Sequence, residues 1–309
     1  MRNIYGAQNF AQTELPAHKS ATSVKPSFSD VFSIGMDART LYIYNDNNKQ
    51  SSFFQMEGNL YLNAQLTNRF NLTLAKGINS EYEVYGVANY LPYQGILKVG
   101  KFQPSYGWRF QDHSSFVREA MLWPPTYFDT GIEIGIYPSS ISANIGLFNG
   151  SSDQVNPFDN DKGKAFSARL EYRKHIAFLG LGLGGSYWRN DTGINTVDEY
   201  GPFYYINLLG GRLIHLGEVD WLKQKSGITA MATTQSLSFR IQQGLYIEGD
   251  YDYLDPNIDL KSGAVNRYSF HLDYFPIGFM ELEPIIRYYD DGLISDKYWN
   301  LMLQGHFFF

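Results

Sequence analysis

The sequence predicts an all-β fold, a transmembrane antiparallel up-and-down β-barrel of about 16 strands. From residue 31 onward, successive segments alternate apolar with polar side chains. The connections between them are alternately short and long, as in barrels with short periplasmic turns and long extracellular loops. The chain also ends on an aromatic segment, 298–309, whose last residue is Phe309. Together these observations favour a barrel over a helical or mixed fold.

The composition excludes several other classes. The chain has 309 residues, of which 44% are hydrophobic, with 24 Tyr and 22 Phe. It holds no apolar run of about 18 residues that could form a membrane-spanning helix. The net charge of −6 argues against nucleic acid as a partner. Because cysteine is absent, the chain has no disulfide scaffold, thiol nucleophile, thiolate metal site or covalent haem attachment.

Two regions differ in character. Residues 1–30 are polar and aperiodic and lack the apolar core of a signal peptide, so we expect a loose N-terminal periplasmic extension. Docking of this extension to a partner, or plugging of the pore, stays open. Residues 31–309 are expected to form the barrel.

Each predicted strand has one apolar and one polar face. In segment 53–66, Leu60 and Leu62 alternate with Asn59 and Asn63. The predicted strands are 31–44, 53–66, 70–76, 82–90, 95–102, 128–137, 141–148, 166–173, 179–188, 203–209, 213–224, 230–241, 245–253, 267–274, 281–289 and 298–309.

The last segment shows the same division most clearly. Its odd positions from Trp299 to Phe309 are apolar apart from one glycine, and its even positions include Asn300, Gln304 and His306. The odd face is expected to meet lipid and the even face the pore. To close the barrel, this strand has to pair with segment 31–44.

The connections give an independent test. Short ones are 67–69, 92–94, 138–140, 210–212, 242–244 and 276–278, and long polar ones are 45–51, 103–127, 150–164, 190–202, 254–266 and 290–296. This alternation of short and long connections places both termini on the periplasmic side. The alternative, a soluble sandwich or barrel, would close an apolar lumen too wide for its side chains to fill.

The longest connection, 103–127, is the expected site of selection. It follows the fifth strand, and we expect it to fold into the lumen and narrow the pore; an exposed cap is the alternative. Mixed charge at a narrow, low-dielectric waist would bias which ions pass. The expected constriction residues are Lys101, Arg109, Asp112, His113, Arg118 and Glu119.

Several stretches resemble a known family. KVGKFQPSYGWRF from Lys98, GEVDW from Gly217, YIEGDYDYLDPN from Tyr246 and RYYDD from Arg287 are similar to strands and loops of the phosphate-selective porins of the O and P type. The resemblance covers about half of the chain. It implies a bacterial outer-membrane porin-like barrel that acts as a diffusion channel.

A phosphate-selective pore would need a cluster of Lys or Arg facing the lumen. The inward-facing charges of this sequence differ from that pattern. Acids outnumber bases, so the wide part of the lumen is expected to hold cations. Pairing of the acids with Arg240 and Arg267 in a wall network is the alternative to an ion site. The expected lumen-lining residues are Arg39, Glu57, Arg169, Glu171, Glu218, Asp220, Arg240, Glu248, Asp250, Asp252, Arg267 and Arg287.

These features predict a passive porin of the cell outer membrane for small hydrophilic solutes or ions, in contact with lipid and lipopolysaccharide. The alternative is a structural sheath that houses or anchors partner proteins, such as a multihaem cytochrome or a surface lipoprotein. A homotrimer is suggested only by analogy with other sixteen-stranded porins.

No enzyme, cofactor or metal site is expected. Asp112, His113 and a serine are adjacent in sequence, and no nucleophile elbow is present, so they do not indicate a hydrolase. A cation held by loop acids near Asp255 and Asp259, or near Asp159 and Asp161, stays open as an alternative.

Overall fold

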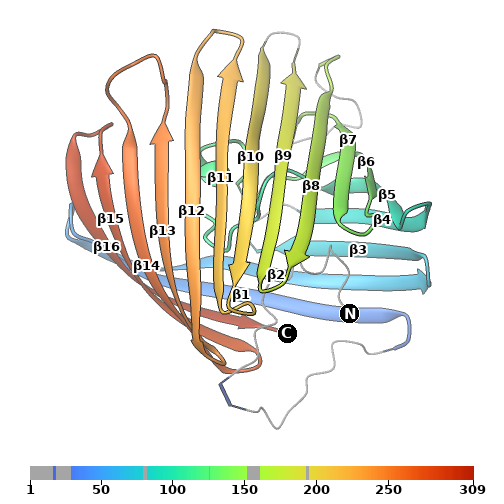
Figure 1. Ribbon diagram of the computed structural model, residues 1–309, viewed down its shortest axis with the longest axis horizontal. Coiled ribbons are helices and arrows are strands. Elements are labelled where there is room, and N and C mark those ends of the chain that lie inside the picture. Colours follow the sequence, from blue (N-terminus) through green and yellow to red (C-terminus); the bar gives the residue numbers. More distant parts are fainter. Residues whose placement is uncertain (1–16, 19–28, 79–81, 125, 152–160, 193–194) are drawn as a thin grey trace.

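The computed structural model of the chain describes residues 17–18, 29–78, 82–124, 126–151, 161–192 and 195–309. Figure 1 labels the strands. They are β1 (Phe32–Asn45), β2 (Gln50–Thr67), β3 (Phe70–Gly77), β4 (Tyr82–Leu91), β5 (Gly95–Phe102), β6 (Asp129–Ile136), β7 (Ile141–Phe148), β8 (Ala165–Ile176), β9 (Leu179–Asp191), β10 (Thr196–Leu208), β11 (Leu213–Gln224), β12 (Thr229–Gln242), β13 (Leu245–Asp255), β14 (Val265–Ile277), β15 (Met280–Asp291) and β16 (Asp296–Phe308). A short helix, α2 (Phe116–Glu119), lies between β5 and β6. No helix within the described ranges is long and apolar enough to cross a membrane.

The sheet closes on itself. Each strand pairs antiparallel with its neighbours in the chain, and β1 pairs with β16. In this closing pair Arg39 lies opposite His306 and Leu41 opposite Gln304. Closure leaves no unpaired strand edge. The predicted all-β antiparallel barrel of sixteen strands is therefore confirmed, with the expected pairing of its first and last strands.

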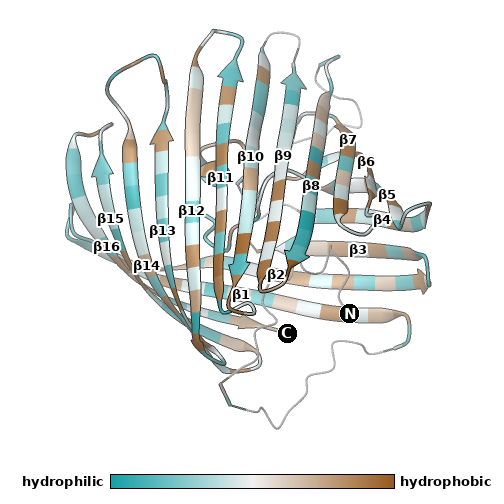
Figure 2. Ribbon diagram, in the orientation of Figure 1, coloured by the Kyte–Doolittle hydropathy of each residue, from teal (hydrophilic) through white to brown (hydrophobic). Residues whose placement is uncertain are grey.

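The two faces of the strands meet different surroundings. In β16, Trp299 is 47% exposed and Leu303 is 51% exposed, whereas Met302 and Gln304, the two neighbours of Leu303, are 7% and 3% exposed. Figure 2 shows the alternation of hydrophobic and hydrophilic residues along the strands. Apolar side chains on the outside and polar ones on the inside are the arrangement of a barrel surrounded by lipid.

Several strands extend further than predicted. Segment 190–202 was expected to be a long loop, but β9 and β10 continue into it, and Arg189 pairs with Asp198 across them at 3.6 Å. Pro202, the last residue of that expected loop, lies within β10 although proline interrupts strand hydrogen bonding. It is accommodated opposite Gly185 of β9, at a point where the ladder with β11 is interrupted. Strands likewise extend into the expected loops 254–266 and 290–296.

The N-terminal extension touches the barrel at one described point. The backbone N–H groups of Ala17 and His18 donate to the carbonyls of Phe275 (2.8 Å) and Pro276 (3.2 Å) near the end of β14. That end carries the short turns, where the extension was expected. Residues 1–16 and 19–28, most of the predicted extension, lie outside the described residues.

Candidate pore constriction

The connection between β5 and β6, residues 103–128 and called L3 below, runs through the inside of the barrel (Figure 1). Near its start, the N–H and hydroxyl of Ser105 donate to Glu133 of β6 at 3.0 and 2.9 Å. A few residues later, the N–H of Trp108 donates to Glu218 of β11 at 2.6 Å. These bonds join strands far apart in the barrel order, so L3 crosses the lumen.

Gly107 allows L3 to approach the wall closely. Its φ of +42° lies in the left-handed region, and a Cβ there would lie 1.7 Å from Oε1 of Glu218. Its N–H donates to the hydroxyl of Ser186 at 2.9 Å, and its carbonyl accepts from Nε of Arg169 at 3.2 Å. Only glycine fits this position without displacing the loop or Glu218.

The middle of L3 is fastened to the opposite wall by charge. Asp112 Oδ2 lies 2.6 Å from Arg287 Nη2 and 3.2 Å from Arg267 Nη2. The Ser114 carbonyl accepts from Arg267 Nη1 at 2.8 Å, and the Ser114 hydroxyl accepts from Arg287 Nη1 at 2.8 Å. Burial opposes ionisation of Asp112, but the two guanidinium groups outweigh it and hold its pKa well below the usual range. L3 is thereby held between β6 and β15.

Apolar packing holds the rest of L3. Tyr106 stacks on Trp123 with ring centroids 4.7 Å apart, and Trp123 meets Trp188 of β9 edge to face at 5.1 Å. Val117 and Met121 are fully buried. The alternative of an exposed cap is therefore wrong for the described part of L3. The loop is a packed element of the barrel interior.

Four of the expected constriction residues lie in this packed stretch, where Arg118 is buried and Arg109, Asp112 and His113 are partly exposed. Arg109 donates to the carbonyl of Gln103 at 3.3 Å, and Arg118 donates to the carbonyl of Phe110 at 3.0 Å. His113 lies 3.8 Å from Glu57. Burial lowers the pKa of His113 to about 3, with help from nearby arginines, and lowers the pKa of Arg118 to about 10. Asp112, described above, completes the four.

The two other expected constriction residues are placed differently. Lys101 lies on the outward phase of β5 with Val99, and its ammonium sits 4.9 Å from the ring centroid of Tyr82, itself 48% exposed. The prediction that Lys101 lines the constriction is corrected: Lys101 is two positions from outward-facing Val99 and so shares its outward face, while Phe102 faces inward. Glu119 ends α2 and is exposed.

The predicted lumen-lining residues lie on the inward phase of their strands. Arg39, Arg169, Glu171, Glu218, Asp220, Asp250, Asp252, Arg267 and Arg287 are buried, and Glu57, Arg240 and Glu248 are partly exposed. Arg267 pairs with Asp252 at 2.8 Å, which is the wall pairing that the sequence suggested. Arg240 makes no such ion pair with the described residues.

Sequence analysis missed the role of two inward histidines. His271 lies between Asp250 (2.8 Å) and Glu283 (2.6 Å), and His306 lies between Asp37 and Glu281 (2.9 and 2.7 Å). Their inward phase was readable, but their partners come from neighbouring strands. Of the loop acids weighed as cation ligands, Asp159 lies outside the described residues.

Known structures share this architecture. OmpT, an outer membrane protein of Vibrio cholerae, is 11% identical with a TM-score of 0.68, covering 93% of this chain and 100% of that one. OprB of Pseudomonas putida is 9% identical with a TM-score of 0.67, covering 90% and 94%. The anion-selective porin of Comamonas acidovorans is 11% identical with a TM-score of 0.63, covering 90% and 99%. No protein-family model and no curated protein matches the sequence. At these identities, the likeness establishes the barrel fold.

Proposed function

We propose that the chain is an outer-membrane porin, a passive diffusion channel for small hydrophilic solutes or ions that is narrowed by L3. The observation that carries this is the fastening of L3 inside a closed barrel, with Asp112 held by Arg267 and Arg287. A charged loop across an aqueous lumen selects by size and charge. The half-exposed apolar outer face would sit in lipid and lipopolysaccharide of the cell outer membrane.

The wall charges favour cations in the wider part of the lumen. Glu218 and Asp220 of β11 and Glu199 of β10 accept hydrogen bonds from Trp108, Tyr106 and Trp123 of L3, in each case a neutral donor. These three carboxylates are buried against L3, so the cation preference rests on the other inward side chains, among which acids still outnumber bases. Clefts lined by one sign of charge concentrate ions of the other sign. We expect a preference for cations over anions.

A chemical role is not supported by the geometry around Ser114. Its hydroxyl lies 2.7 Å from Asp112 Oδ1 and accepts from Arg287, while His113 is near Glu57 instead. A nucleophile needs a base within hydrogen-bond reach that a third group orients. Within the described part of L3, Ser114 and His113 are therefore proposed to hold the loop in place rather than to catalyse a reaction.

The sheath alternative required L3 to stay outside the lumen, because a threaded partner needs that space. With L3 packed between β6 and β15, the channel is favoured. A trimer is compatible with the fold, since OmpT of Vibrio cholerae has been solved in a trimer form.

Reconstitution of the purified protein in planar bilayers tests the proposal. We expect stepwise conductance in KCl, and in a salt gradient a reversal potential displaced toward that of K⁺. Absence of conductance from folded, inserted protein would overturn the channel. Conductance with a displacement toward Cl⁻ would keep the channel and overturn the cation preference.

A further inference from the structure

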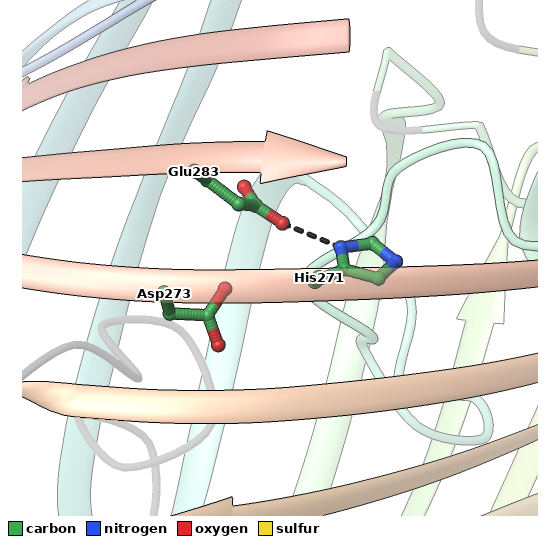
Figure 3. Close-up of side chains that lie close together, drawn as sticks. All are labelled: His271, Asp273 and Glu283. Carbon is green, nitrogen blue, oxygen red and sulfur yellow. Dashed lines mark hydrogen bonds and ion pairs between the residues drawn. The ribbon is translucent and has the colours of Figure 1, made fainter. Parts of the chain in front are cut away.

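Three side chains with metal-binding chemistry converge on the lumen wall. His271 and Asp273 are two residues apart on β14 and share its inward face, and Glu283 lies on the neighbouring β15. One ligand atom from each lies within 4.8 Å of the others. Figure 3 shows the three side chains projecting from adjacent strands, with Glu283 joined to His271. Two neighbouring strands therefore present one imidazole and two carboxylates to a common point.

Asp273 is the unusual member of this group. Its exposure is 6%, that of His271 is 3% and that of Glu283 is 5%. Among the described residues, no hydrogen-bond donor or ion-pair partner contacts the Asp273 carboxylate. Burying a carboxylate without a partner is costly, and buried charges are normally paired or bound to a metal. The group is thus incomplete as a set of internal contacts.

His271 is oriented as a metal-binding histidine would be. Its Nε2 lies 2.8 Å from Asp250 Oδ2 on β13, while its Nδ1 lies 2.6 Å from Glu283 on the side facing Asp273. Histidines that bind metals usually donate their other ring N–H to a carboxylate, which fixes the ring and raises its basicity. Asp250 lies at ion-pair distance from Nε2 without hydrogen-bond geometry, so it is placed to accept this N–H once an ion orients the ring, and Nδ1 faces Glu283 and Asp273.

The surrounding charge favours a cation. Glu248 lies opposite His271 in the β13–β14 register, so the imidazole is surrounded by Glu248, Asp250, Asp273 and Glu283. Within the described residues, His271 is the only cationic side chain at ion-pair distance from Asp250 or Glu283. A divalent ion would offset this excess of negative charge.

We propose that His271, Asp273 and Glu283 bind one divalent transition-metal ion of the Zn²⁺ class, with Asp250 as the positioning residue. One imidazole and two carboxylates suit Zn²⁺ and similar ions, whereas Ca²⁺ and Mg²⁺ prefer sites made of oxygen alone. Solvent would fill the remaining position. The ion replaces the proton between Nδ1 and Glu283, so the two groups separate slightly to admit it.

Zn²⁺ binding to the tag-free, full-length barrel in detergent tests the proposal, after stripping with EDTA and dialysis. We expect one Zn²⁺ per chain by elemental analysis and a calorimetric isotherm that a large excess of Ca²⁺ does not abolish. Asp273→Asn should abolish this isotherm, and Asp250→Asn should weaken it by about 10–100-fold. Since Asp273→Asn removes an unpartnered buried charge, this variant is expected to fold, which heat-modified mobility on gels verifies.

The chain offers a matched control. His306 also lies between two carboxylates, Asp37 and Glu281, so His306→Gln removes a comparable imidazole elsewhere on the wall. We expect it to retain full Zn²⁺ binding. The proposal is overturned if the wild type takes up no Zn²⁺, if Asp273→Asn binds as the wild type does, or if His306→Gln loses the isotherm. The binding assay is independent of conductance, so its result does not depend on the channel proposal.

Discussion

Asp112→Asn is the substitution that most sharply perturbs the fastening of L3. Its carboxylate meets Arg287 at 2.6 Å and Arg267 at 3.2 Å, and these arginine side chains are 6% and 1% exposed. Removing one partner of a buried ion pair costs about 3–5 kcal/mol. Because Arg267 keeps Asp252 at 2.8 Å, the lower end applies, about 3 kcal/mol. The ratio of detached to fastened L3 should therefore rise about 100-fold.

Single-channel recording measures this change as current noise and as the lifetime of conductance substates, and denaturant unfolding in detergent measures the loss of stability. The matched control is Asp46→Asn, which removes an exposed aspartate that pairs with Lys49 in an outer turn. We expect noisier current and easier unfolding for Asp112→Asn alone. If both variants behave as the wild type does, the ion pairs do not hold L3 and the reasoning from burial is refuted.

Three further predictions address the same region. The pKa of folded Asp112 is depressed, so its stabilising contribution is complete above the ordinary aspartate pKa of about 3.9 and is lost below it; the part of the channel noise that Asp112→Asn produces should appear in the unsubstituted protein only below about pH 4. Gly107→Ala should displace L3 and change the conductance, whereas Gly210→Ala, also at positive φ but with nothing within 4 Å, should not; equal conductance in both would contradict the close approach to Glu218. Lys101→Gln should leave the reversal potential unchanged because Lys101 faces outward, and a shift would place it in the pore.

The alternating pattern was sufficient to predict the barrel because each strand has two distinct environments. The odd-numbered residues of β16 lie on the outer face and the even-numbered ones on the inner face, as the alternation predicted. The pairing of β16 with β1 follows from closure of the barrel. Strand ends were less predictable. Residues 190–202 were expected to form a loop, yet Pro202 lies within β10, where Gly185 opposite it and a break in the ladder to β11 accommodate the missing N–H.

The candidate site was predictable only where its contacts are local. The position and length of L3 indicated an in-folded loop, but the sequence could not show that Asp112 meets Arg287, since the two are far apart in the chain. The prediction for Lys101 was wrong because this residue was assigned to the constriction by its closeness in sequence to L3. It still belongs to β5, where side chains alternate between the two faces, and its position places it on the outward face. His271, Asp273 and Glu283 escaped detection as a group because the spacing of metal ligands across two strands depends on register.

The central claim, a channel narrowed by L3, is tested most directly by thiol modification at Glu119, an exposed position on α2. The chain contains no cysteine, so Glu119→Cys carries the only thiol. In planar bilayers, adding a bulky cationic thiosulfonate reagent should lower the current of each open channel in one irreversible step, and the unsubstituted protein should not respond. Confirmed labelling of Glu119→Cys with no change in current would show that L3 lies outside the conduction path and would contradict the account.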